Sequence, residues 1–129
     1  LHTIEIVFNT NLSKERFDND IEVVLYRVVC ELVNNSLKHS GCSKIEISLM
    51  LKSCYLQLHY SDNGCGFNPD KIISNGMGLS NITSRVDSLN GELQITSAEG
   101  EGIHVLANIN TSQNEPHAPK QRKRRWEKR

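Results

Sequence analysis

Residues 25–47 read "LYRVVCELVNNSLKHSGCSKIEI", and this stretch joins a predicted helix to a predicted strand. From about residue 19 to residue 39, apolar residues recur at helical spacing, at Ile21, Val24, Leu25, Val28, Leu32 and Leu37. "SG" at 40–41 ends this pattern, since glycine readily caps the C-terminus of a helix. Ile45 and Ile47 then alternate with polar residues, as is typical of a strand.

The end of the predicted helix carries several polar residues. Glu31, Asn35, Lys38 and His39 fall at i, i+4, i+7 and i+8, so they share one face of an α-helix. A solvated face is the ordinary explanation of such a stripe, and the rest of the chain has to decide. An asparagine carbonyl is a plausible Mg²⁺ ligand beside phosphate oxygens. A carboxylate one turn earlier can orient water or a nucleophile.

The remaining elements indicate a two-layer fold. Alternation predicts strands at 3–8, 44–52 and 54–62, and two more within 92–109, while helical spacing predicts a second helix at 79–89. Two helices are too few to cover both faces of a five-stranded sheet. We therefore expect an α+β fold, a two-layer α/β sandwich with a mixed five-stranded sheet and helices on one face.

The stretch "SDNGCGF" at 61–67 follows a predicted strand. Asp62 there can accept a hydrogen bond from an exocyclic amino group, which adenine offers and guanine replaces with a carbonyl at that position. A buried acceptor left unpaired costs about 1–3 kcal/mol, so this contact would select adenine. Gly64 and Gly66 would leave room for a flat ring. An Asn-Gly turn is the competing explanation.

A second glycine segment, "NGMGLSNI" at 75–82, runs into the predicted second helix. Gly76 and Gly78 precede a helix that begins near Leu79, and a helix N-terminus presents unpaired N–H groups to phosphate. Alone, such a turn is more often structural. Three polar segments in this order in one small α/β domain indicate a nucleotide site.

Charge separates a body from a tail. The net charge of the 129 residues is zero, yet residues 120–129 hold seven Lys/Arg and one Glu. We expect residues 1–110 to form one domain and 111–129 to be a basic, disordered tail. The acidic balance of the body argues against a direct nucleic-acid partner. A basic tail that binds nucleic acid is the remaining alternative of that class.

The four cysteines, at 30, 42, 54 and 65, lack the close pairs of a zinc knuckle. We expect free thiols in a reducing compartment, which places the domain in the cytoplasm. No apolar run approaches the length of about 20 residues that a membrane span needs. Membrane anchoring of a parent protein stays open.

"ELVNNSLKH", "DNGCGF" and "GMGL" resemble the N box, G1 box and G2 box of the GHKL ATP-binding fold. Residues 25–47 are similar to the catalytic ATP-binding domain of sensor histidine kinases, of the subgroup whose response regulators carry a helix-turn-helix output. The resemblance runs from about residue 4 to 109. It implies ATP and Mg²⁺ as cofactors and a two-layer α/β sandwich as the fold.

The resemblance also implies roles for individual residues. In the N box, Asn35 would bind Mg²⁺, Glu31 would be the catalytic residue, and Lys38 and His39 would approach the phosphates. In the G1 box, Asp62 would bind the adenine amino group, with Gly64 and Gly66 shaping the adenine pocket. In the G2 box, the lid hinge and the helix start would use Gly76, Gly78 and Leu79. Ile103 departs from the pattern, because many relatives have a threonine there that supports the adenine contact.

The resulting hypothesis is an ATP-binding catalytic domain that positions Mg-ATP for phosphoryl transfer to a histidine. None of the five histidines suits a dimerisation helix, so we expect the acceptor on an upstream dimerisation domain and little self-phosphorylation of this chain. The implied partners are that domain and a response regulator, with a homodimeric parent protein. Alternatives are a Ser/Thr kinase of the anti-sigma-factor type and a non-catalytic nucleotide-sensing module.

Overall fold

The computed structural model describes residues 3–66, 79–112 and 125–128. Its elements are β1 (Glu5–Thr10), α1 (Asn19–Asn35), η1 (Ser36–Ser40), β2 (Lys44–Lys52), β3 (Tyr55–Asp62), α3 (Leu79–Ser88), β4 (Glu92–Ser97), β5 (Ile103–Asn110) and β6 (Arg125–Lys128). The element η1 is one turn of π-helix that continues α1.

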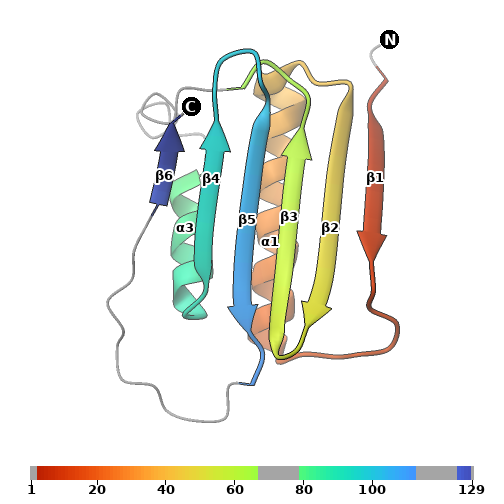
Figure 1. The fold of residues 1–129 in the computed structure, drawn as a ribbon, viewed down its shortest axis with the longest axis vertical. Coiled ribbons are helices and arrows are strands. Elements are labelled where there is room, and N and C mark those ends of the chain that lie inside the picture. The colour runs from red at the N-terminus through yellow and green to blue at the C-terminus, as the bar shows by residue number, and fades with distance from the viewer. Residues whose placement is uncertain (1–2, 67–78, 113–124, 129) are drawn as a thin grey trace.

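The strands form one mixed sheet in the order β1-β2-β3-β5-β4-β6. β1 pairs with β2 and β4 pairs with β6 in parallel, and the other neighbours are antiparallel. Both α-helices lie on the same face of the sheet (Figure 1). The predicted two-layer α+β sandwich is therefore confirmed.

The core lies between the sheet and these helices. The register places Tyr60 opposite Val105 and Leu58 opposite Ala107, so alternate residues of β3 and β5 share the covered face. The helical stripe predicted for residues 19–39 supplies the other side of this core, with buried Ile21, Leu25, Val28 and Leu32. Burial of this apolar surface is the main driving force for the fold.

The long helix changes character near its end. α-Helical geometry stops at Asn35, and residues 36–40 form a π-helical turn. Ser40 Oγ donates to the carbonyl of Ser36 at 2.8 Å. In an α-helix this carbonyl would accept the backbone N–H of residue 40, so the hydroxyl competes with that backbone hydrogen bond. Gly41, with a φ of 64°, ends the turn in the left-handed region, as the sequence predicts.

The tail differs from the expectation in four residues. Residues 125–128 form β6, which pairs with β4 at the edge of the sheet. The sequence predicts five strands and a disordered tail, so the prediction is wrong for these four residues. β6 joins the five predicted strands as a sixth. The other residues beyond 112 lie outside the described part of the chain, so the tail prediction stays untested there.

All four cysteines are free, as predicted, and Cys42 is buried. Within the described ranges, no helix is long and apolar enough to cross a membrane.

Candidate functional site

Asp62 brings together three segments that are far apart in the sequence. It ends β3, and its side chain is only 5% exposed. Ser36 Oγ, at the start of η1, donates to Asp62 Oδ2 at 2.7 Å. The backbone N–H groups of Gly64 and Ile103 donate to Asp62 Oδ1 at 3.0 and 3.3 Å. The helix end, the loop after β3 and the start of β5 therefore meet at one carboxylate.

Tyr60 lies behind this carboxylate on the same face of β3. Its hydroxyl contacts Ser36 Oγ and lies 3.0 Å from the carbonyl oxygen of Leu32, and its single proton can go to either of these two oxygens. Burial raises the pKa of Tyr60 well above its usual value, the hydrogen bond to Ser36 lowers it in part, and the charge of Asp62 raises it further. The phenol therefore remains protonated and acts as a hydrogen-bond donor.

The glycines of the loop after β3 allow close packing of protein against protein. A Cβ on Gly64 would lie 2.5 Å from both Cβ and the carbonyl oxygen of Ser40. Gly66 has a φ of 69°, and a Cβ there would lie 2.0 Å from the carbonyl oxygen of Ala98. Protein atoms from η1 and the turn after β4 therefore lie where a side chain at either position would begin. The prediction that Gly64 and Gly66 shape an adenine pocket stays a prediction.

Asn63 and Cys65 fix the same loop to the helix end. Asn63 Oδ1 accepts hydrogen bonds from the N–H groups of Ser43 and Lys44 at 2.9 and 3.0 Å. The N–H of Cys65 donates to the carbonyl of Ser40 at 2.8 Å. These bonds hold the loop and the start of β2 together, so the position of Asp62 is set by backbone geometry on both sides.

The predicted polar stripe divides between two environments. Glu31 is half-buried and Asn35 is 9% exposed, whereas Lys38 and His39 are exposed on η1. The expectation of one shared face assumed α-helical spacing through residue 39. Because residues 36–40 form a π-helix, α-helical spacing stops at Asn35, and the prediction that Lys38 and His39 share a face with Glu31 and Asn35 stays a prediction.

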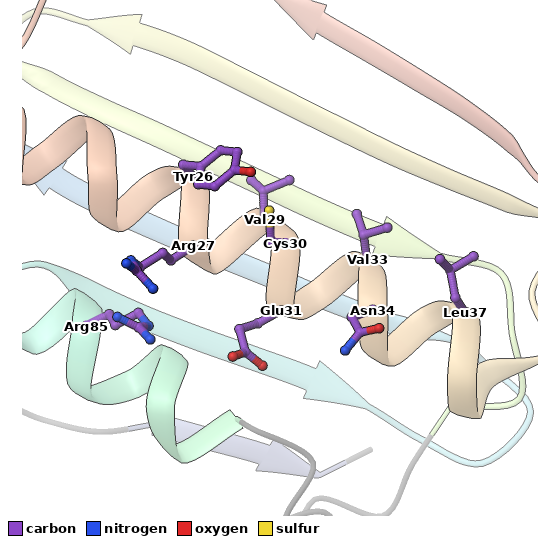
Figure 2. Close-up of a pocket in the computed structure, with 9 residues that line it drawn as sticks. All are labelled: Tyr26, Arg27, Val29, Cys30, Glu31, Val33, Asn34, Leu37 and Arg85. Carbon is purple, nitrogen blue, oxygen red and sulfur yellow. The ribbon is translucent and has the colours of Figure 1, made fainter.

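A cleft of about 640 Å³ lies on the outward side of α1, within the usual size range of small-molecule sites. Its lining residues are Tyr26, Arg27, Val29, Cys30, Glu31, Val33, Asn34, Leu37 and Arg85. Figure 2 shows Glu31 and Asn34 on the side of α1 that faces α3, where Arg85 lies. Asp62 does not line this cleft. The adenine contact predicted for Asp62 therefore stays a prediction, and the lining of this cleft does not bear on it.

Arg85 is a candidate binding residue that the sequence motifs do not include. Its Nε atom is buried and has no hydrogen-bond partner among the described residues. A buried guanidinium N–H without a partner suits an anionic oxygen, and the residue shares the cleft with Glu31. The sequence does contain a signal for this residue. Arg85 is a cationic residue almost two turns into the helix that begins at Leu79, directly after Gly76 and Gly78.

Two other missed residues are Ser36 and Tyr60. Ser36 stands inside the quoted polar segment, and Tyr60 precedes Asp62 by two positions on one strand, so both could have been proposed as its neighbours. Gly76 and Gly78, and a short helical turn predicted around residues 69–73, lie outside the described residues. Leu79 begins α3, as predicted.

The metal prediction rests on Asn35. Among the described residues, no three His, Cys, Asp or Glu side chains gather closely enough to hold a metal ion. A Mg²⁺ ion bound by one asparagine oxygen and the phosphates of its nucleotide needs no such group. The assignment of Asn35 to Mg²⁺ therefore stays a prediction.

Comparison with known proteins identifies relatives over most of the chain. Residues 20–113 match the family model described as histidine kinase-, DNA gyrase B-, and HSP90-like ATPase. The oxygen sensor histidine kinase NreB of Staphylococcus carnosus is 36% identical over 107 residues, which cover 82% of this chain and 31% of that protein. The sensor histidine kinase ComP of Bacillus subtilis is 38% identical over 104 residues, which cover 76% of this chain and 14% of that protein.

Solved structures share the fold at lower identity. The histidine kinase AdeS of Acinetobacter baumannii superimposes with a TM-score of 0.70 at 18% identity, over 87% of this chain and 56% of that one. A histidine kinase domain from Erythrobacter litoralis gives a TM-score of 0.66 at 23% identity, over 84% of this chain and 52% of that one. With respect to the two sensor histidine kinases NreB and ComP, the chain spans less than a third of the length of each.

Proposed function

Because the chain belongs to the family of histidine kinase-, DNA gyrase B- and HSP90-like ATPases, we propose that it is the ATP-binding catalytic domain of a sensor histidine kinase. In this role it positions Mg-ATP so that the terminal phosphoryl group can pass to a histidine on another domain. Both curated relatives named above are sensor histidine kinases, which favours a histidine over a serine or threonine as the acceptor.

One observation carries the nucleotide part of the proposal. Asp62 is buried, and its carboxylate accepts hydrogen bonds from the helix end, from its own loop and from β5. A buried carboxylate held in this way is a fixed acceptor, and adenine presents an amino donor where guanine presents a carbonyl. Discrimination by a buried polar group is strong, because the wrong partner leaves it unpaired.

The phosphate end of the site is proposed from the other polar residues. Asn35 would hold Mg²⁺, which neutralises phosphate charge, and Arg85 would approach phosphate oxygens through its unpartnered Nε. Lys38 and His39 are exposed N–H donors at the helix end and would approach the same oxygens. Glu31, within the cleft, would orient the attacking histidine. Gly76 and Gly78 would form the hinge of a lid that begins before α3.

The acceptor histidine is proposed to lie on a dimerisation domain of the parent protein, which would be a homodimer. His59 and His104 lie on strands of the sheet and His39 lies on η1, so none of these three stands on a separate helix. The phosphoryl group would then pass to a response regulator, of the kind with a helix-turn-helix output. Little self-phosphorylation is expected of this chain alone, and robust labelling by radioactive ATP would contradict that.

Asp62→Asn tests the adenine assignment without removing the contacts around the side chain. The amide oxygen can keep the N–H groups of Gly64 and Ile103, and the new NH₂ group can donate to Ser36, whose proton turns toward Tyr60. The fold should therefore survive. The group that faces adenine becomes a donor, and ATP affinity should fall by about 5- to 150-fold.

Calorimetry with ATP and GTP in the presence of Mg²⁺ measures the effect. Wild type should prefer ATP strongly, and the variant should lose most of that preference. Equal affinities of wild type for ATP and GTP would remove the adenine assignment. In the same experiments, Asn35→Asp should change the Mg²⁺ dependence of binding, and an unchanged metal titration would count against Asn35 as a ligand.

A further inference from the structure

Three buried side chains form a continuous line of hydrogen bonds that ends on the proposed adenine contact. Tyr60 is 0% exposed, Ser36 is 2% exposed and Asp62 is 5% exposed. Tyr60 Oη contacts Ser36 Oγ, and Ser36 Oγ donates to Asp62 Oδ2 at 2.7 Å. Because water has little access to these groups, their protons have to be arranged among themselves.

The carboxylate decides the direction of this line. A carboxylate can only accept, so the hydroxyl proton of Ser36 points to Asp62 Oδ2. The Ser36 oxygen then needs a donor from its other side, and Tyr60 is the hydroxyl in contact with it. The carbonyl of Leu32, the other acceptor near Tyr60, already accepts the backbone N–H of Ser36. The Tyr60 proton thus has two acceptors within reach, this carbonyl and Ser36 Oγ, and we place it on Ser36, because the Ser36 oxygen otherwise has no donor.

The acceptor sites of Asp62 can be counted. A carboxylate has about four lone-pair sites, two on each oxygen. Gly64 and Ile103 occupy Oδ1 through their N–H groups, and Ser36 occupies one site of Oδ2. Among the described residues, nothing else donates to Asp62, so one site on Oδ2 remains beside the bond from Ser36. Position 103 offers only a backbone N–H, since isoleucine has no hydroxyl.

From this arrangement we propose that Ser36 and Tyr60 are positioning residues for nucleotide selectivity. Ser36, held by Tyr60, fixes the plane of the Asp62 carboxylate so that its last free acceptor site meets the 6-amino group of adenine. The inference rests on the proposed function, because it requires Asp62 to contact adenine. It predicts that the selectivity of Asp62 depends on a hydroxyl that does not itself touch the base.

A purely structural role for Ser36 makes a different prediction. Loss of a buried hydrogen bond would loosen the helix end and weaken every nucleotide alike. A positioning role affects only ligands that carry the 6-amino group. The probe is therefore the pair of ATP and purine riboside triphosphate, which share sugar and triphosphate and differ by that amino group.

The variants are Ser36→Ala and Tyr60→Phe, with Ser40→Ala as the matched control. Ser40 is also 2% exposed and also in η1, but its hydroxyl donates to the backbone carbonyl of Ser36. Ser36→Ala should reduce ATP affinity about tenfold, because a carboxylate that is no longer fixed loses most of its hydrogen bond to the 6-amino group, and should change affinity for the purine analogue less than about twofold. Tyr60→Phe should reduce the ATP preference by a smaller factor, since Ser36 keeps its bond to Asp62. Ser40→Ala should leave the preference unchanged.

The outcomes separate this inference from the proposed function. If wild type fails to prefer ATP over the purine analogue, the adenine assignment of Asp62 fails and the inference fails with it. If wild type prefers ATP and Asp62→Asn does not, but Ser36→Ala keeps the full preference, only the inference is overturned. Equal weakening of both ligands by Ser36→Ala would also overturn it. If Ser36→Ala does not fold, Tyr60→Phe decides, because an unchanged preference there contradicts the proposed line of protons.

Discussion

Gly66→Ala should destabilise the protein through a steric clash. Gly41→Ala and Gly100→Ala serve as controls, because they introduce the same backbone strain without a clash. Gly66 has a φ of 69°, and a Cβ there would lie 2.0 Å from the carbonyl oxygen of Ala98. Gly41 and Gly100 have φ values of 64° and 81°, yet nothing lies within 4 Å of the Cβ that either would carry. The three positions share the backbone conformation and differ in the space around it.

The magnitude follows from two contributions. A left-handed conformation costs an L-residue about 1–2 kcal/mol. Replacing glycine by alanine returns about 0.4–1 kcal/mol by restricting the unfolded chain. Gly41→Ala and Gly100→Ala should therefore lower the free energy of unfolding by about 1 kcal/mol. Gly66→Ala adds overpacking of about 1–3 kcal/mol, for a total of about 2–4 kcal/mol.

Urea unfolding of the three variants, followed by circular dichroism, measures these differences. Gly66→Ala should also weaken ATP binding, because the loop that carries Asp62 has to move away from the turn after β4, where the N–H of Gly100 donates to the carbonyl of Cys65. Gly100→Ala, in that same turn, should bind ATP nearly as wild type does. If Gly66→Ala proves as stable as Gly100→Ala, the close backbone approach at Gly66 does not exist in solution.

Three further predictions concern the body of the fold. Leu58→Ala should lower the free energy of unfolding by about 2–5 kcal/mol because Leu58 is 1% exposed, whereas Leu37→Ala, at 56% exposed, should stay within about 0.5 kcal/mol in the same urea assay. The side-chain hydrogen bond from Arg16 lowers the pKa of Glu22 from 4.5 to about 2, so the stability from this pair is present above pH 4.5 and lost as the pH falls through 2. Urea midpoints of Glu22→Gln should change less steeply than wild type between those pH values, and parallel curves would contradict the assignment. Removing residues 113–129 should leave a cooperative unfolding transition, because β6 pairs only with the edge of β4, and loss of that transition would move the domain boundary beyond residue 110.

The sequence is informative about elements whose pattern repeats locally. The apolar spacing marks α1. Ile21, Leu25, Val28 and Leu32 are buried as that spacing predicts, Val24 is partly buried, and Leu37, in the turn after α1, is 56% exposed. Gly41 marks the helix end because few other residues adopt its conformation. The same local logic covers β2 and β3, whose alternation follows from one covered face. Asp62 could be proposed as an adenine contact because a lone acid at a strand end, followed by glycines, is a short-range signal.

The candidate site is less predictable wherever its chemistry depends on contacts across the fold. Ser36 and Asp62 are 26 positions apart, and only the pairing of β3 with the helix layer brings their oxygens to 2.7 Å. Within the π-helical turn, the hydroxyl of Ser40 donates to the carbonyl of Ser36, a contact that no hydrophobic pattern records. Arg85 could not be proposed from the sequence, because the burial of its Nε atom without a hydrogen-bond partner among the described residues arises only when the chain folds.

The sequence by itself determined the layer architecture, the helix end at Gly41 and the identity of the acid proposed to select adenine, since each follows from residue types within a few positions. Only the tertiary structure decided that the backbone at Gly64 and Gly66 packs too closely against other protein atoms to carry a Cβ, and that β6 extends the sheet. It also decided that Asp62 keeps a single acceptor site free among the described contacts. The physical reason is that hydrogen bonds and close approaches between distant segments exist only after the chain has folded.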